Sequence, residues 1–150
     1  GRSFSVCVRA RPDRKAVSGA EDGGLRYWDL EGLDGRSIKG FQAHDRAATC
    51  VVADLIHMRA LTGSEDRELK LWDLEGSRCI RSFKTAGGVL CLAADFTRMR
   101  ALSGLDTSML QLWDLSSSES ICTLDADAES WIGYSARVFC VAADFAAGRA

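Results

Sequence analysis

The sequence predicts an all-β protein in which a unit of four short strands is repeated along the chain. Trp28, Trp72 and Trp113 are spaced 44 and 41 residues apart, and each is followed by Asp-Leu. Within each repeat, short apolar or alternating runs are separated by turn-rich segments, as expected of strands. The composition of 14 glycines and 1 proline in 150 residues favours many tight turns rather than a linker.

The four expected strands follow one another clearly in the second repeat. Cys50–Ala53 is continuously apolar, which is expected of an inner strand covered on both faces. Met58–Thr62 comes next, and in Glu68–Trp72 polar and apolar residues alternate as in a half-buried strand. Cys79–Phe83 completes the unit. Four strands in ~42 residues with a Trp-Asp pair are typical of a β-propeller blade.

The repeats predict a partial propeller within one domain of residues 1–150. Three complete blades are expected near residues 3–41, 47–83 and 88–124, followed by a truncated fourth blade from about residue 137. The chain is therefore expected to be a fragment of about three and a half repeats. Because propellers typically have 4–8 blades, we expect that the remaining blades or another copy are needed to close the ring.

Together, the repeats resemble the WD40 family. The resemblance rests on the three Trp-Asp dipeptides, each preceded ten residues earlier by Ser-Gly or Thr-Gly, and it extends over nearly the whole chain from about Ser5. It implies that hydrogen bonds among four residues of a blade fix the loops at one propeller face. In the second repeat all four positions match, at His44, Thr62, Asp66 and Trp72.

The other repeats match this set only in part. In the third repeat Thr85 stands at the histidine position, and in the fourth Gly133-Tyr134 replaces Gly-His. In the first repeat the histidine position would lie before Gly1. The partial sets are Ser18, Asp22 and Trp28 in the first repeat, and Ser103, Asp106 and Trp113 in the third.

We expect no enzymatic activity from these residues. His44, Thr62 and Asp66 superficially resemble a Ser/His/Asp triad, but a nucleophile needs an open site with an oxyanion hole, and the sequence supplies none. It also has no Gly-Lys-Ser/Thr phosphate loop. With only 2 histidines and no Cys-x-x-Cys pair, neither a metal site nor a cofactor is expected.

The resemblance implies a non-catalytic scaffold that binds protein or peptide partners. One alternative is a recruiting or regulatory propeller region attached to a catalytic domain or enzyme complex elsewhere. A weaker alternative is nucleic-acid binding, against which the net charge of −2 argues. The longest apolar runs have 6 residues, so no membrane span is expected.

Cysteine usage favours an intracellular, cytoplasmic location, with the nucleus left open. Cys7, Cys50, Cys91 and Cys140 each lie inside a short apolar run, where a reduced cysteine behaves as a small buried hydrophobic residue. Reduced thiols fit a reducing compartment.

Two further features invite alternative interpretations. Three acid–base pairs flank equivalent hairpin turns, where we expect cross-turn ion pairs rather than a basic recognition surface: Asp54/Arg59, Asp95/Arg100 and Asp144/Arg149. The connection at 125–136 is longer than its counterparts, and it is either a partner-binding patch or a length variation whose tryptophan packs back on the blade. The candidate partner-binding residues in it are Asp127, Glu129, Trp131 and Tyr134.

Overall fold

The structure is a computed structural model. In the part of the chain that it describes, the regular elements are all antiparallel strands. This part comprises residues 3–9, for which only the backbone is considered, 14–31, 36–126 and 141. It holds twelve strands and no helix, arranged in three four-stranded sheets. The prediction of an all-β partial propeller with four-stranded blades is therefore confirmed for these three sheets. The fourth blade, expected from about residue 137, lies outside the described residues.

Each sheet is a meander in which every strand pairs with its neighbours along the chain. The first contains β1 (Ser3–Arg9), β2 (Lys15–Ala20), β3 (Gly24–Asp29) and β4 (Arg36–Gln42). The second contains β5 (Ala48–Asp54), β6 (Arg59–Ser64), β7 (Glu68–Asp73) and β8 (Arg78–Lys84). The third contains β9 (Val89–Asp95), β10 (Arg100–Leu105), β11 (Met109–Asp114) and β12 (Glu119–Asp125).

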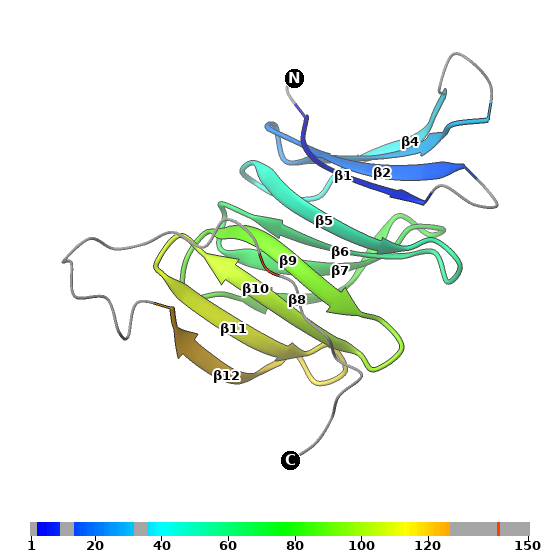
Figure 1. Cartoon of the computed structure of the whole chain (residues 1–150). Helices are drawn as coiled ribbons and strands as arrows, with labels where there is room; N and C mark the ends of the chain where they lie inside the picture. The colour runs from blue at the N-terminus through cyan, green and yellow to red at the C-terminus, as the bar shows by residue number, and fades with distance from the viewer. Residues whose placement is uncertain (1–2, 10–13, 32–35, 127–140, 142–150) are drawn as a thin grey trace.

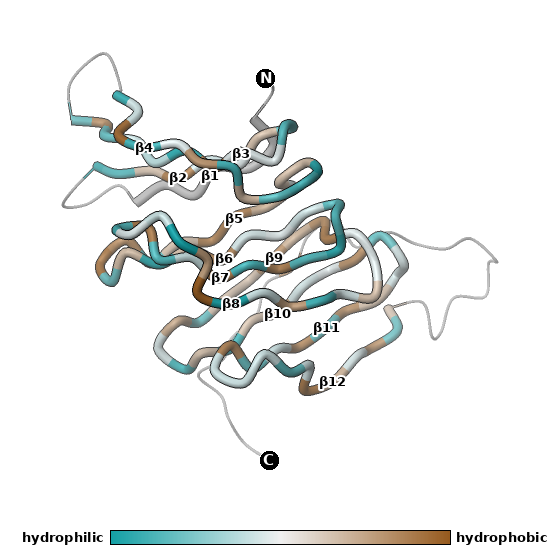
Figure 2. The backbone as a smooth tube through the Cα atoms, turned by 180° about the vertical axis from the view of Figure 1, so that it is seen from behind, coloured by the Kyte–Doolittle hydropathy of each residue, from teal (hydrophilic) through white to brown (hydrophobic). Residues whose placement is uncertain are grey.

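The three sheets stack in an arc, as blades around a common centre do (Figure 1). The first strands of the sheets are neighbours, since β1 contacts β5 and β5 contacts β9. The fourth strands, β4, β8 and β12, lie one below another when the molecule is seen from behind (Figure 2). The chain thus runs from the inner to the outer edge of each sheet and then returns to begin the next.

A tryptophan and a phenylalanine form the same contact at both described interfaces between sheets. Phe41 on β4 packs against Trp72 on β7 with ring centroids 5.0 Å apart, and Phe83 on β8 packs against Trp113 on β11 at 5.7 Å. The pairing of the third and fourth strands shifts register just before each tryptophan. The second and third Trp-Asp repeats therefore each supply one ring that packs against the preceding blade.

Glycines bring the inner strands of neighbouring sheets close together. A Cβ atom on Gly63 of β6 would lie 2.5 Å from Cγ1 of Val89 on β9, and one on Gly19 of β2 would lie 2.9 Å from the carbonyl oxygen of Ala48 on β5. Leucines of the second sheet, Leu61, Leu69 and Leu71, fill the space toward the third sheet and are buried.

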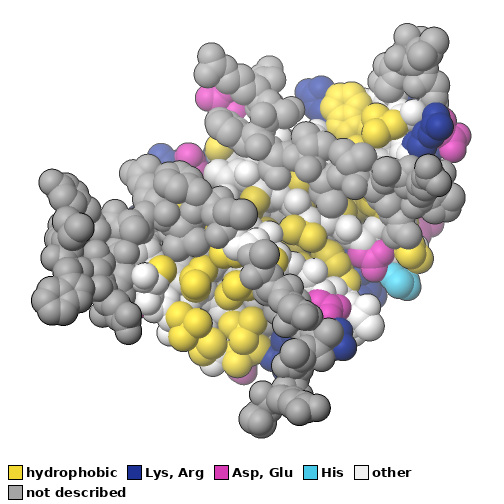
Figure 3. All heavy atoms as spheres, in the orientation of Figure 1, with side chains coloured by type: hydrophobic (Ala, Val, Ile, Leu, Met, Phe, Trp, Pro, Cys, Tyr) yellow, Lys and Arg dark blue, Asp and Glu magenta, His cyan; other side chains and the backbone are white. Residues whose placement is uncertain are grey.

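The outward face of the third sheet is far less covered by described residues. Leu102, Leu110 and Leu112 are only partly buried, although they repeat the positions of the three buried leucines of the second sheet. Leu124 is 54% exposed, whereas Phe83 at the equivalent position is 1% exposed. Figure 3 shows hydrophobic side chains gathered over β10, β11 and β12.

No helix in the described ranges has the length and apolar character needed to cross a membrane.

Candidate functional site

The four residues expected to form a hydrogen-bonded set in the second repeat lie in direct contact. His44 comes from the segment between β4 and β5, Thr62 from β6, Asp66 from the β6–β7 turn and Trp72 from β7. His44 Nδ1 is 2.8 Å from Asp66 Oδ2, and His44 Nε2 is 2.7 Å from Thr62 Oγ1. The Trp72 indole N–H donates to Thr62 Oγ1 over 3.0 Å. Four side chains from four segments thus form one continuous chain of hydrogen bonds.

The direction of these hydrogen bonds follows from the chemistry of their groups. The Asp66 carboxylate can only accept, so His44 Nδ1 must carry the proton. Burial lowers the pKa of His44, although the neighbouring Asp66 carboxylate opposes this shift, and the imidazole is neutral at pH 7. Its Nε2 is then an acceptor, to which the Thr62 hydroxyl donates. With His44 in this tautomer, the donors and acceptors in this series of hydrogen bonds all have partners.

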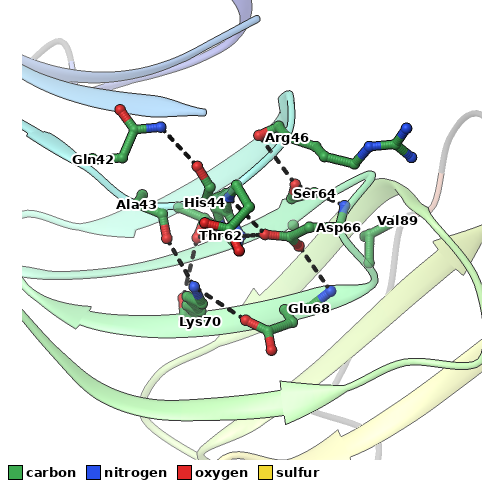
Figure 4. A network of polar contacts seen from close by, with 12 residues as sticks. Gln42, Ala43, His44, Arg46, Thr62, Ser64, Asp66, Glu68, Lys70 and Val89 are labelled. Atoms are coloured by element: carbon green, nitrogen blue, oxygen red, sulfur yellow. Dashed lines mark hydrogen bonds and ion pairs between the residues drawn. The ribbon is translucent and has the colours of Figure 1, made fainter. Parts of the chain in front are cut away.

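The set also holds backbone groups of the surrounding turns. Besides His44, the Asp66 carboxylate accepts hydrogen bonds from the backbone N–H groups of Asp45 at 3.2 Å and Glu68 at 3.0 Å. Lys70 donates to the carbonyl of Ala43 at 2.9 Å (Figure 4). The turn before β5 and the turn after β6 are therefore tied together by buried polar contacts. Sequence reasoning missed Lys70, because an alternating lysine on a strand usually points to solvent.

The first and third repeats keep only the inner part of this set. Trp28 donates to Ser18 Oγ over 2.8 Å, and Trp113 donates to Ser103 Oγ over 3.0 Å. Asp22 accepts from the backbone N–H of Gly24 in its own turn. Asp106 accepts from the backbone N–H of Gly88, at 2.9 Å. The tryptophan–hydroxyl bond is thus the part common to all three sheets.

Gln111 bridges the loop and the outer strand of the third sheet. Its Oε1 accepts from the backbone N–H of Ala86 at 3.2 Å, and its Nε2 donates to Thr123 at 3.3 Å. The Thr85 hydroxyl donates instead to the carbonyl of Gly87, inside its own loop. Gln111 is 7% exposed, and sequence reasoning did not identify it as part of this site. The available signal was that it repeats the strand position of Lys70.

The set in the second repeat is closed to solvent. His44 is 1% exposed and Thr62 is 0% exposed. A nucleophile must reach a substrate carbonyl beside an oxyanion hole, and a threonine hydroxyl enclosed between an indole and an imidazole has no such approach. Among the described residues, no cluster of three or more His, Cys, Asp or Glu side chains is arranged to hold a metal ion.

The expected cross-turn ion pairs are wrong at both described turns. Asp54 pairs with His57 at 2.6 Å, and Asp95 pairs with Arg98 at 2.8 Å, so each carboxylate is bound by the residue three positions later. Both carboxylates also cap N–H groups of their own turns, and the hydrogen bond from Arg98 lowers the pKa of Asp95. The tight turn favours this local pairing because the i+3 side chain lies above the carboxylate. Arg100 reaches Asp114 on the next strand, at 3.7 Å.

Arg59 is left beside a groove between the second and third sheets. Its guanidinium contacts the sulfur of Met99 at 3.9 Å, across the interface. The groove has a volume of about 270 Å³ and lies between the β5–β6 and β9–β10 turns, which are adjacent on one side of the arc, at the right in Figure 1. Ile56, in the first of these turns, is 62% exposed. The groove is lined by Asp54, His57, Arg59, Phe96 and Thr97.

The candidate partner-binding residues of the long connection lie outside the residues that the structure describes. The proposal that Asp127, Glu129, Trp131 and Tyr134 contact a partner therefore rests on the sequence alone. The expected Asp144/Arg149 pair also lies outside the described residues.

Comparison with known proteins gives one family match and one relative. Residues 35–73, about a quarter of the chain, match the model described as WD domain, G-beta repeat. This range runs from β4 through β7 and contains all four residues of the buried set. Over 52 residues the chain is 42% identical to a human protein, Angio-associated migratory cell protein. That match covers 33% of this chain and 12% of the relative's length.

Proposed function

We propose that this chain, which carries WD40 repeats folded as successive blades of a β-propeller, is a non-catalytic scaffold that binds a protein or peptide partner. WD40 repeats generally mediate protein–protein interaction. The observation that carries the proposal here is the groove beside Arg59, since its lining combines the ring of Phe96 with the guanidinium of Arg59, and the exposed Ile56 lies in the turn next to it.

The chemistry of the groove favours a short extended segment with an apolar side chain next to a carboxylate. Ile56 and the partly buried Phe96 offer apolar surface on the two turns. The carboxylates of Asp54 and Asp95 are occupied by His57 and Arg98, whereas the contact of Arg59 among the described residues is to a sulfur atom. An incoming carboxylate would give Arg59 a charge-assisted partner.

The buried polar set supports the non-catalytic part of the proposal. Its imidazole is neutral, hydrogen-bonded at both nitrogen atoms and enclosed, so its role is to hold the turns in place. A scaffold needs this rigidity, because turns that are already ordered lose little entropy when a partner binds.

The proposal is tested by selecting peptides from a random display library against the full chain. The enriched peptides are expected to carry an apolar residue near an acidic one. Their affinity should fall at least ~10-fold, about 1.4 kcal/mol, when Ile56→Glu and Arg59→Glu are introduced together, as measured by fluorescence anisotropy.

The matched control is Ile80→Glu on β8, which is 46% exposed and lies away from the groove. This variant should bind the same peptides with unchanged affinity, and circular dichroism should show an intact fold for both variants. If no peptide is enriched, or if the control weakens binding as much as the groove variant does, the groove is not the binding site.

A further inference from the structure

The β5–β6 and β9–β10 turns each contact the preceding sheet through a methionine sulfur. The Tyr27 hydroxyl on β3 donates to Met58 Sδ over 3.8 Å, and Arg59 on β6 donates from Nη1 to Met99 Sδ over 3.9 Å. Met58 and Met99 occupy equivalent positions in their turns, and both have a positive φ, of 51° and 52° respectively. The same turn conformation thus places a sulfur atom at both described interfaces between sheets.

The two sulfur contacts differ in the group that donates to them. Tyr27 offers a neutral hydroxyl, whereas Arg59 offers a guanidinium, whose hydrogen bonds are strongest to charged oxygens. A thioether sulfur is only a weak acceptor. Among the described residues no carboxylate forms an ion pair with Arg59, since Asp54 and Asp95 are bound within their own turns. The Arg59 guanidinium therefore lacks a strong acceptor beside the Met99 sulfur.

Met99 lies next to the groove that we propose as the binding site. Arg59, Phe96 and Thr97 line this groove, and Phe96 and Thr97 belong to the same turn as Met99. The Met99 side chain packs against the hydrophobic cluster between the second and third sheets but remains partly exposed, so small solutes can reach it. A chemical change at its sulfur would act directly on the cation that a partner's carboxylate needs.

We propose that Met99 is a site of reversible oxidation and that its sulfoxide competes with the partner for Arg59; this inference rests on the proposed function of the groove. In the reaction, a lone pair of Met99 Sδ attacks one oxygen of hydrogen peroxide. An S–O bond forms and the O–O bond breaks. The proton of the transferred hydroxyl passes to the departing hydroxide, which leaves as water, so the sulfur loses two electrons and the peroxide gains them.

Oxidation would turn a weak acceptor at this place into a strong one. The sulfoxide makes the side chain polar, and an oxygen on the side of Arg59 can accept an N–H···O bond from the guanidinium. The guanidinium is then held at the interface between the sheets, and an incoming carboxylate loses its charge-assisted partner. Methionine sulfoxide reductases restore the thioether. Binding in the groove would thus weaken under oxidising conditions and recover afterwards.

The test isolates single methionines, because the chain has 3 of them, Met58, Met99 and Met109. A chain with Met58→Leu and Met109→Leu keeps Met99 alone and is treated with hydrogen peroxide. Mass spectrometry of its peptides is expected to find one added oxygen on Met99. Its affinity for the peptides selected against the full chain should fall ~5-fold in fluorescence anisotropy. Methionine sulfoxide reductases should restore the affinity, which excludes cysteine oxidation as the cause.

The matched control is the chain that keeps Met58 alone, with Met99→Leu and Met109→Leu. Treated in the same way, it should bind the peptides with unchanged affinity, since Tyr27, the donor to Met58, does not line the groove. An equal loss of affinity in both chains, unchanged affinity of the oxidised Met99 chain, or the absence of an added oxygen on Met99 would overturn the inference.

A second measurement needs no partner. Oxidation of the chain that keeps Met99 alone should raise its unfolding equilibrium constant in urea at least ~5-fold more when Arg59→Ala is also present, because the sulfoxide then lacks its donor. Equal changes with and without Arg59 would show that the sulfoxide does not bind the guanidinium. If no peptide binds the chain, the proposed function fails, and this difference in unfolding alone decides whether Met99 sulfoxide engages Arg59.

Discussion

At the scale of single residues, the imidazole of His44 is held in one tautomer by its surroundings. It is buried, neutral and hydrogen-bonded on both sides, with Asp66, Glu68 and Lys70 as the charged groups around it. Protonation would place a charge on Nε2 and remove the acceptor that the Thr62 hydroxyl needs. The proton state of one side chain is thereby coupled to the ordering of two turns.

We expect the stability of the chain to fall on mild acidification because of His44. The pKa of His44 is lowered below its ordinary value of 6.5 in the folded state, so the unfolded chain takes up the proton first. The stabilisation that neutral His44 contributes to the folded state is complete above pH 6.5, and it is lost as the pH falls toward the folded-state pKa of His44. His44→Gln should cost about 1–3 kcal/mol at pH 7.5. The difference in unfolding free energy between this variant and the parent should become smaller toward pH 5, as measured by urea titrations.

Ile80→Gln is the matched control, because Ile80 is 46% exposed and the change neither removes nor adds a titratable group. It should keep the pH dependence of the parent between pH 7.5 and pH 5. The carboxylates with lowered pKa, such as Asp95, act only at lower pH, near and below ~4. If the unfolding free energies of His44→Gln and of the parent changed equally with pH, the loss of stability on acidification could not be assigned to His44.

The residues of the buried set could be found from the sequence because the repeat aligns them. Trp72 and Thr62 keep a fixed spacing on paired strands, and the same spacing places Trp28 near Ser18 and Trp113 near Ser103. The partner of an aspartate could not be found in this way. It depends on the geometry of each turn, which is why Asp54 and Asp95 pair with the i+3 residue and not across the hairpin.

At the scale of strands, Gly63 of β6 faces Val89 of β9 where two neighbouring blades meet. We expect Gly63→Ala to destabilise the chain by about 1–3 kcal/mol. The new Cβ would lie 2.5 Å from Val89 Cγ1 and 2.7 Å from Cys50 Sγ, so β6 and β9 must move apart. Chemical denaturation of the variant measures the loss.

Gly40→Ala on β4 is the control for this substitution. The nearest atom to a Cβ there, Cγ of Arg26, is 3.6 Å away, which is ordinary contact. Alanine loses less backbone entropy than glycine on folding, so this variant should be as stable as the parent or slightly more stable. A similar loss in both variants would mean that the close approach at Gly63 is not what costs stability.

The strand order itself was predictable, whereas the contacts between blades were not. Alternating polarity and turn residues identify β7 and its neighbours within the second repeat. The Phe41–Trp72 and Phe83–Trp113 ring contacts join separate blades, and no local pattern indicates which ring meets which. The register shift that precedes each of these tryptophans, and so helps to orient its ring, could not be predicted from the sequence either.

At the scale of the whole molecule, the described residues form three blades in an arc, and the third sheet carries leucines that are only partly buried. We expect a chain of these 150 residues to associate at high concentration, since propellers typically close with 4–8 blades. Leu124, at 54% exposed, and the partly buried Leu110 and Leu112 provide the apolar surface. Light scattering should show oligomers or aggregates, and Leu124→Lys should raise the monomer fraction several-fold.

Ile80→Lys on the outer strand β8 is the control for this surface. Its side chain is 46% exposed, and it belongs to β8, the edge strand of the second sheet, not to the third sheet. It should leave the oligomeric state unchanged. A cooperatively folded monomer of the parent chain at high concentration would contradict the expectation that the arc needs further blades or another copy.

The contact between a tryptophan of one blade and a phenylalanine of the preceding blade couples the two blades. This coupling determines how cooperatively the blades unfold. Among the described sheets, β5 contacts β1, β2 and β9, whereas β9 to β12 make their described contacts between sheets on one side alone. Stability in such an array is a sum of blade terms and nearest-neighbour coupling terms. Most pairings join segments close in sequence, so little loop entropy opposes them. We therefore expect the second blade, coupled on both sides, to open last among the described blades, so that in a hydrogen-exchange experiment the amide hydrogens of β6 and β7 exchange most slowly among the described strands.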